Sequence, residues 1–429
     1  MSGNRIAAIP SVRIARNPLL TADFALLMLA QASFGYAYSG FFLLPKFLVA
    51  TLGAGPGEVG LAMAVYGVTA IVSMPAMGVA VDRFGRRDFL TAGALAMALA
   101  CVGFVAVREM GGVLYALRAL QGLGFAMAFV AGITLAVDGA PPERLGQSIA
   151  LVGLATLSMN AVGPAVMEHV ADRAGWPWGF VVAAGAALGA AVLSRFVRDD
   201  GRVPPPTGPG PGLWEILRDP AQLRIAVVVM LAGTGFGAMI TFHQPFALSL
   251  GMRHVRGFFV AYAAAAIVVR VGFGALIDGI GWRRVSLAAL VLYGVVVAAM
   301  ASLGTLGAAG LALLGAGLGI AHGLFYPSLN ALAVAGCGRD ERGKVMAIFQ
   351  AAFTIGFAGG NYPLGILAER AGYPAVFIAA GLCAFLGLGV LFASPEGRRD
   401  AQEPVAPGAA VGACNARRAA RRASSGGCE

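Results

Sequence analysis

The sequence predicts an all-α polytopic membrane protein with twelve transmembrane helices in two pseudo-symmetric six-helix halves. Of its 429 residues, 58% are hydrophobic and only 12% are charged, about half the charged share of a soluble domain. A span takes about 20 mostly apolar residues, so the chain has room for roughly a dozen. The charges fall in short clusters between apolar runs, and part of this pattern repeats after about 196 residues. These observations exclude a soluble enzyme, a disordered chain and a disulfide-rich secreted protein.

The apolar runs place the spans in order along the chain. Each must be a helix, because backbone polar groups find no water in the hydrocarbon. We expect spans at 23–46, 58–80, 89–107, 111–137, 146–167, 177–197, 223–248, 257–277, 285–304, 306–335, 345–368 and 374–395.

The spans divide the chain into five segments. We expect an N-tail at 1–22, a first half at 23–197, a central loop at 198–222, a second half at 223–395 and a tail at 396–429. In the central loop the Pro/Gly run 202–212 predicts an extended spacer, and "LWEILRD" predicts a short interfacial helix. The Ala/Gly/Arg-rich tail is predicted to be disordered.

The basic residues predict the orientation. With both termini on one side, 23 of the 31 Lys and Arg residues fall on that side, 6 fall opposite, and Arg118 and Arg270 lie inside spans. The positive-inside rule therefore places both termini in the cytoplasm. The net charge of +10 then reflects topology and needs no nucleic-acid partner. Arg-rich, Lys-poor usage and the lack of a signal-peptide pattern favour a bacterial inner membrane.

The two halves share residues at a constant offset. The motif "RAGWPWGF" at 173–180 returns as "RAGYPAVF" at 370–377. Two halves in the same orientation are the expected build of one transporter class, with the substrate site between them near the midplane. At an offset of 196 the matched pairs are Tyr66 and Tyr262, Gly78 and Gly274, Asp82 and Asp278, Gly85 and Gly281, and Arg87 and Arg283.

The loop after span 2 carries a motif that identifies a family resemblance. It reads Gly78-x-x-x-Asp82-Arg83-x-Gly85-Arg86-Arg87. This resembles the signature loop of the major facilitator superfamily, and the resemblance covers about residues 20–395. A degraded second copy reads Gly274-x-x-x-Asp278-Gly279-x-Gly281-Trp282-Arg283. The resemblance implies that these two loops gate conformational change.

The residue chemistry of these loops suggests a cytoplasmic latch. We expect Asp82 to hold the start of span 11, near Arg342 and Lys344, because a helix N-terminus carries positive partial charge. Asp278 would mirror this against span 5, near Arg144. The alternative is that the arginines only set topology, since surface ion pairs are individually weak.

Five residues are candidates for ion coupling. "Arg118-x-x-Gln121-Gly" in span 4 resembles a second motif of the family, which is associated with proton coupling, and a cation inside a span is usually functional or paired. Glu168 is a possible carboxylate proton site, and the imidazoles of His243 and His322 titrate near neutrality. The alternative for each is structural packing. Gly163-Pro164 in span 5 resembles a third, exchanger-associated motif only in part, which weakens the prediction of antiport.

Polar residues inside the spans are candidates for the substrate cavity, although each could equally hold helices together. Pro45 and Pro245 interrupt corresponding helices of the two halves, which points to a cavity there. The mix of amides and aromatics fits a moderately polar solute or an anion, and Arg270 either meets such an anion or snorkels. The candidates are Tyr36, Tyr38, Asn160, Gln244, Tyr326, Asn330, Gln350 and Asn361, with Gln31 as a further polar residue.

The sequence thus predicts a secondary active transporter that exports a small organic solute in exchange for protons or another ion. Alternatives are an importer or facilitator of an organic anion or metabolite, and a transporter-like sensor or lipid-handling protein. We expect no enzyme activity, metal or cofactor, because no metal-ligand cluster or nucleophile–base pair appears. We also expect a monomer in the bilayer.

Overall fold

In a computed structural model of the chain, the described residues are 21–138, 145–199, 212–272, 280–335, 337 and 339–393. Within these ranges every regular element is a helix, which confirms the all-α fold class. Eight helices are long and apolar enough to cross a membrane, and two of them run 53 and 52 residues. The count of twelve spans stays a prediction. The tail at 396–429 and the Pro/Gly run up to 211 lie outside the described residues.

The first half begins with a helix that changes pitch near its end. Thr21 caps it, accepting a hydrogen bond from the Phe24 amide at 3.1 Å. A short 3₁₀ turn then precedes Pro45, whose ring suits the first turn of the next helix. The elements are α1 (Ala22–Gly40), η1 (Phe41–Leu43), α2 (Leu44–Leu52), α3 (Pro56–Phe84), α4 (Arg86–Val105), α5 (Gly112–Asp138), α6 (Leu145–Ala174) and α7 (Trp176–Arg195).

The predicted short helix of the central loop is present as α8 (Leu213–Leu217), just before the second half. Gly307 and Gly372 have positive φ and mark kinks inside the last two helices. The kink at Gly372 divides α14 into stretches that match the eleventh and twelfth predicted spans. The remaining elements are α9 (Pro220–Ser249), α10 (Arg256–Gly272), α12 (Trp282–Ala299), η3 (Met300–Ser302), α13 (Leu303–Val334) and α14 (Arg339–Phe392).

The repeat in the sequence is also a repeat in backbone conformation. Gly85 and Gly281, which match at an offset of 196, both have φ of 97° and both precede a helix. This left-handed region favours glycine because other residues carry a Cβ that clashes there. The first span of each half also matches in burial. In α9, 78% of the apolar stretch is buried inside the structure, and in the α1–α2 span 67% is, more than in the other candidate spans.

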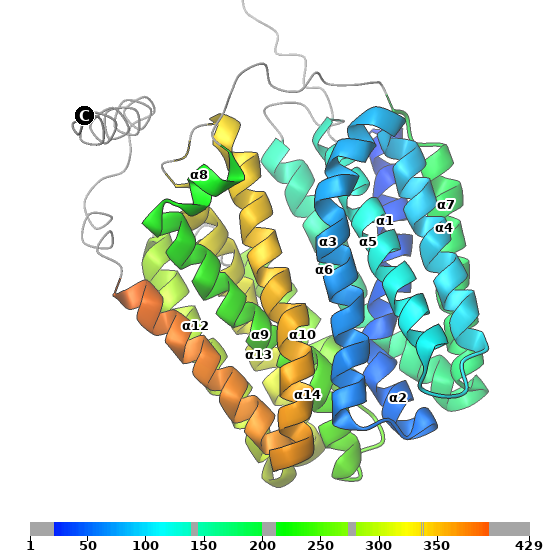
Figure 1. Cartoon of the computed structure of the whole chain (residues 1–429), viewed down its shortest axis with the longest axis vertical. Helices are drawn as coiled ribbons and strands as arrows, with labels where there is room; N and C mark the ends of the chain where they lie inside the picture. Colours follow the sequence, from blue (N-terminus) through cyan, green and yellow to red (C-terminus); the bar gives the residue numbers. More distant parts are fainter. Residues whose placement is uncertain are drawn as a thin grey trace, which may run out of the picture.

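The two halves pack most closely along α3 and α14. A Cβ on Gly365 would lie 2.6 Å from the carbonyl oxygen of Pro56, and one on Gly60 would meet the backbone of Asn361. Small residues permit this close helix approach. These contacts lie in the first part of α3, and in Figure 1 the two helices lie close at the end of the bundle where α2 lies and diverge toward the other end.

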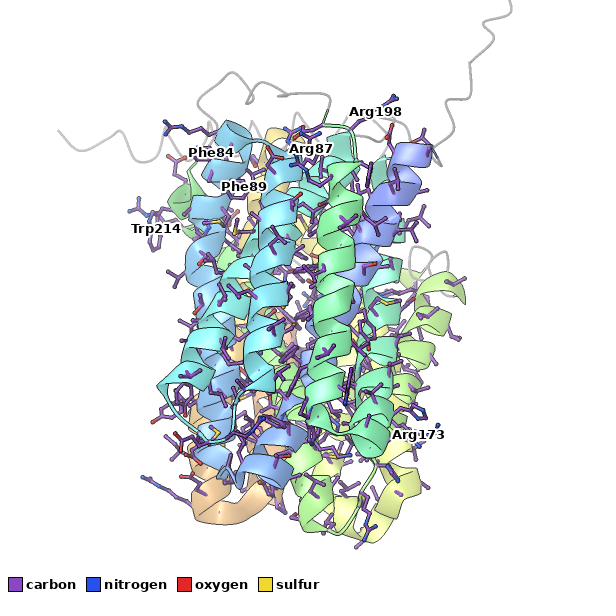
Figure 2. All side chains as sticks on the ribbon, turned by 90° about the vertical axis from the view of Figure 1, so that its right-hand side faces the viewer. Phe84, Arg87, Phe89, Arg173, Arg198 and Trp214 are labelled. Atoms are coloured by element: carbon purple, nitrogen blue, oxygen red, sulfur yellow. The ribbon has the colours of Figure 1, made fainter. Side chains whose placement is uncertain are left out.

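The signature loop lies at the opposite end from α2. Figure 2 shows Phe84, Arg87, Phe89 and Arg198 at one end and Arg173 at the other. We call the end that contains α2 the clamp end, for the ion pair described below, and the end that contains Gly85 the loop end.

Candidate functional site

A buried ion pair lies at the clamp end. The Lys46 ammonium of α2 lies 2.6 Å from the Glu168 carboxylate of α6, and the two side chains are 8% and 0% exposed. Lys46 also donates to the carbonyl oxygen of Arg253, at 2.7 Å, in the loop between α9 and α10. The pair belongs to the first half and Arg253 to the second, so the ammonium group joins the two halves.

The Glu168 carboxylate caps a helix of the other half. One of its oxygens accepts the Val255 amide at 2.9 Å, and the other accepts the Arg256 amide at 2.7 Å. Arg256 begins α10, and the first amides of a helix have no partner within it and carry positive partial charge. Together with the lysine, this buried carboxylate has three charge-assisted bonds, which offset its desolvation.

Two further carboxylates complete this end. Asp172, one turn after Glu168, lies 3.2 Å from His254 and 3.7 Å from Lys46. Glu369 of α14 accepts the Gly57 amide at 2.9 Å, in the first turn of α3. Each half therefore supplies a carboxylate that caps a helix of the other. We call Lys46, Glu168, Asp172 and the backbone of residues 253–256 the clamp.

Gln244 adds a second tie between the halves. Its side-chain amide on α9 donates to the Phe42 carbonyl at 2.6 Å, and its oxygen accepts the Lys46 backbone amide at 3.3 Å. The residue is fully buried. The predicted cavity residue thus makes hydrogen bonds across the interface beside the clamp.

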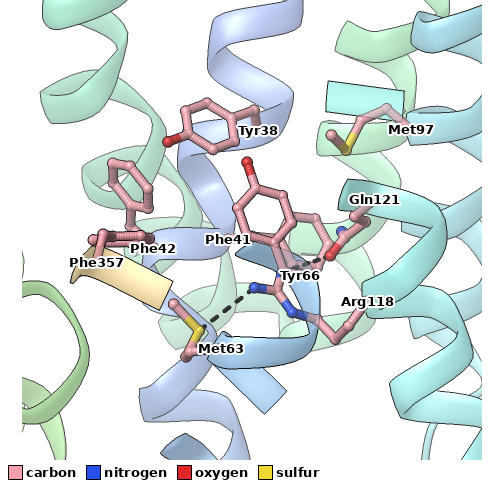
Figure 3. Close-up of a pocket in the computed structure, with 9 residues that line it drawn as sticks. All are labelled: Tyr38, Phe41, Phe42, Met63, Tyr66, Met97, Arg118, Gln121 and Phe357. Carbon is pink, nitrogen blue, oxygen red and sulfur yellow. Dashed lines mark hydrogen bonds between the residues drawn. The ribbon is translucent and has the colours of Figure 1, made fainter. Parts of the chain in front are cut away.

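Deeper in the first half, two aromatic rings lie against the candidate residue Tyr38. The ring of Tyr38 lies 6.1 Å from Tyr66 and 4.7 Å from Phe125, and the latter two rings are 5.8 Å apart. We call these three residues the first triad. Figure 3 shows a pocket beside it, lined by Tyr38, Phe41, Phe42, Met63, Tyr66, Met97, Arg118, Gln121 and Phe357.

Arg118 and Gln121 meet in this pocket. The Arg118 guanidinium donates to the Gln121 side-chain oxygen at 2.7 Å and to the Ala62 carbonyl at 3.0 Å, and it lies 4.6 Å from the centre of the Tyr66 ring. It is 2% exposed, and among the described residues no carboxylate pairs with it. Backbone, amide and ring contacts therefore stabilise this buried cation.

The second half contains a matching ring cluster. Phe236 lies 4.9 Å from His322 and 5.9 Å from Tyr262, and His322 lies 6.0 Å from Tyr262. We call these residues the second triad. They stand 198, 197 and 196 residues after Tyr38, Phe125 and Tyr66 respectively, a correspondence that follows the repeat.

The second triad contains one imidazole ring, that of His322. The Nδ1 atom of His322 lies 3.0 Å from the Tyr262 hydroxyl, while its Nε2 atom is buried without a hydrogen-bond partner. Close by, the Tyr326 hydroxyl donates to the Gln350 side-chain oxygen at 2.6 Å. The candidate Tyr326 lies next to His322, with 5.2 Å between the ring centres, and the candidate Gln350 is joined to it through Tyr326.

Other candidates are more scattered. His243 stacks on Phe258 at 4.0 Å, and its Nδ1 pairs with the Met239 carbonyl, so it packs within the second half. Asn361 is fully buried at the α3–α14 contact, with both side-chain polar atoms unpartnered. Single buried polar atoms without a partner also occur on Gln31, Tyr36, Asn160 and Asn330.

The predicted cytoplasmic latch falls largely outside the described residues. The surroundings of Gly78 and Asp82 are not described, and Arg144, Gly274 and Asp278 lie outside the described residues. In the described part of the loop, a carboxylate other than Asp82 binds the start of α4. Asp199 accepts hydrogen bonds from the Arg86 and Arg87 amides at 2.9 and 3.1 Å. Arg83 is exposed, with its guanidinium 5.5 Å from the centre of the Phe84 ring.

Several residues of the site were not among the sequence-based candidates. Lys46 and Asp172 carried no pattern that linked them to Glu168, since pairing across 122 residues depends on packing. Phe236 and Phe357 read as ordinary apolar residues. Tyr66 and Tyr262 had a usable signal, because they recur at the repeat offset.

The sequence matches the profile of the Major Facilitator Superfamily over residues 25–314 and 257–424. A Bos taurus synaptic vesicular amine transporter is 27% identical over 335 residues, covering 76% of this chain and 64% of that protein. The chain thus covers slightly less than two thirds of that relative's length. The multi-drug resistance efflux pump PmrA of Streptococcus pneumoniae is 24% identical over 349 residues, covering 78% of this chain and 86% of the pump.

Solved structures show the same fold at low identity. The nucleoside transporter NupG aligns with a TM-score of 0.72 at 12% identity, covering 86% of this chain and 99% of that one. A bacterial homologue of the human lysosomal transporter Spinster aligns with a TM-score of 0.73 at 13% identity, covering 91% and 99%.

Proposed function

The chain belongs to the major facilitator superfamily, and from this premise we propose that it exports a small organic solute in exchange for protons. It is a multi-pass membrane protein. We further propose that it lies in a bacterial inner membrane with both termini in the cytoplasm. This orientation follows the arginine bias and makes the clamp end the outer end.

The clamp is the observation that carries this proposal. At the outer end the halves are joined by Lys46 with Arg253, by Glu168 with the start of α10, and by Gln244 with Phe42. We interpret this arrangement as the state in which the outer exit is closed. Rocking of one half against the other would break these bonds and open the exit.

Opening changes the surroundings of Glu168 in a specific way. Its carboxylate loses the two amides and the positive end of α10, which all belong to the other half. Lys46 stays with it, but Asp172 is 3.7 Å from that ammonium and can take over as partner. Protonation of Glu168 from outside therefore favours the open clamp, and deprotonation favours the closed one. This links proton entry to outward release of the solute.

A vesicle assay tests function and direction together. Inverted inner-membrane vesicles containing the protein are energised with an internal acid pH, and a dye reports the pH while single compounds from a chemically varied panel are added. We expect an active compound to accelerate proton efflux from vesicles with wild-type protein. A Glu168→Gln variant should abolish that response. Glu58→Gln is the matched control, because Glu58 is exposed and caps only its own helix α3, and it should largely retain the response.

One observation favours a second candidate function. Arg118 lies inside a helix with no carboxylate partner among the described residues, and such a cation suits an anionic solute. An importer or facilitator of an organic anion would accumulate that labelled anion in whole cells and give no proton efflux in inverted vesicles. That pair of results would replace export with import.

A further inference from the structure

The two triads differ at two positions: Tyr38 corresponds to Phe236, and a phenylalanine corresponds to a histidine. The second difference carries chemical information. Phe125 in the first triad corresponds to His322 in the second, in otherwise aromatic surroundings. Phe357 connects the two clusters, because it lines the pocket beside the first triad and its ring lies 6.0 Å from that of Phe236. Aromatic side chains of both halves thus gather about Phe357, and they favour a planar ring that can stack.

His322 presents an unused hydrogen-bonding atom within this aromatic region. The residue is 7% exposed, and its Nε2 has no partner although Nδ1 is bonded to Tyr262. A buried polar atom without a partner destabilises the protein, so a bound ligand that pairs with it gains affinity. If the Tyr262 hydroxyl donates to Nδ1, the free Nε2–H is a donor.

Arg270 adds a positive charge to the same region. It lies on α10 two turns after Tyr262, and its buried Nε atom has no hydrogen-bond partner. Its guanidinium lies within electrostatic range of His322 and Tyr326.

The carboxylates are distributed elsewhere. Among the described side chains, Asp23, Glu58 and Glu168 lie near helix ends, and Glu369 lies just before the kink at Gly372. A cationic amine beside the triads would therefore meet guanidinium groups and no described carboxylate. An anion would meet the unpartnered Nε–H of Arg270 and, in the tautomer above, the Nε2–H of His322, and a bond to the guanidinium is charge-assisted.

We propose that the transported solute is a planar aromatic acid, its ring between the triads beside Phe357 and its carboxylate on Arg270 and His322 Nε2. This inference rests on the proposed function, because it takes the central region to be the transport site. It differs from the amine named for the vesicular relatives.

Binding to the purified full-length protein in detergent tests the proposal without requiring transport. Four probes separate ring from charge: indole-3-acetate, indole-3-acetamide, tryptamine and cyclohexylacetate. Isothermal titration calorimetry measures each Kd. The test variants are Arg270→Gln and His322→Phe, the latter carrying the residue found at the matching position of the first triad. His169→Phe, at an exposed position near the clamp end, is the matched histidine control.

We expect indole-3-acetate to bind most tightly and both test variants to weaken it by about 10- to 100-fold, the value of a charge-assisted hydrogen bond. Indole-3-acetamide should bind wild type more weakly than indole-3-acetate does, and its Kd should change little in the two test variants. His169→Phe should bind all four probes as wild type does. Tighter binding of tryptamine, equal binding of cyclohexylacetate, or unchanged binding in both variants would overturn the proposal. If the acid fails to bind but other panel compounds drive proton efflux from vesicles, the proposed export stands and the substrate class is wrong. If the acid binds but drives no proton efflux, the substrate class stands and the proposed export is wrong.

Discussion

Replacing Glu168 by Gln should shift the protein toward a state with the clamp open. The substitution keeps the shape of the side chain but removes the charge and one acceptor oxygen. Three bonds are affected, at 2.6 Å to Lys46, 2.9 Å to Val255 and 2.7 Å to Arg256. The two amide bonds cross between the halves, so their charge assistance contributes directly to closure.

The magnitude follows from these bonds. A hydrogen bond to a charged group contributes about 1.5–3 kcal/mol, and a neutral amide oxygen retains part of that. The closed state also buries Lys46, at 8% exposure, which the variant leaves with Asp172 at 3.7 Å as its nearest carboxylate. Both effects destabilise the closed state. We expect a shift of about 2–4 kcal/mol, or roughly 30- to 900-fold in the ratio of open to closed protein.

Distance measurements between spin labels report this shift. Cysteines that replace Thr51 on α2 and Arg370 on α14 place one label on each half at the clamp end, in a background without the native cysteines. The wild-type distance should lengthen as the pH falls. The Glu168→Gln protein should show the long distance at every pH, and Glu58→Gln, which alters a cap within one half, should resemble wild type. A short distance in Glu168→Gln with wild-type pH dependence would refute the role of the clamp.

Three further substitutions test other contacts. Lys46→Gln should weaken closure less in a Glu168→Gln background than alone, and additive effects in a double-mutant cycle on the label distances would contradict the pairing. Arg118→Gln should lower transport at least 10-fold with expression and folding retained, since the pocket loses its cation; wild-type flux in vesicles would exclude a functional role. Gly60→Val should hold the outer end open by collision with the Asn361 backbone, seen as a lasting long label distance, and normal closure would contradict the close approach of α3 and α14.

The fold was largely predictable from the sequence because the bilayer restricts it. Apolar runs must be helices, and the repeat of Gly85 as Gly281 reappears as the same backbone conformation. The corner in α14 also follows the repeat: Gly372 has non-helical backbone angles, as Gly175 has at the matching corner between α6 and α7, so the chain turns there between two helices.

The site was predictable only in part. Arg118 and Gln121 are one helical turn apart, so their contact follows from local spacing. Glu168 was recognised as a candidate, but its partners Lys46 and Arg256 lie 122 and 88 residues away and meet it only through tertiary packing. His322 attracted attention as a histidine, whereas its correspondence to Phe125 emerges only when both ring clusters are compared in space.

The most direct test of the central claim is proton movement coupled to solute in proteoliposomes that contain only this protein. With an acidic lumen and a panel compound that the protein transports added outside, we predict that wild-type protein releases protons as the compound enters. Glu168→Gln should release no protons and should exchange labelled for unlabelled compound only slowly, because it seldom closes the clamp. Proton release by Glu168→Gln at the wild-type rate would contradict the account.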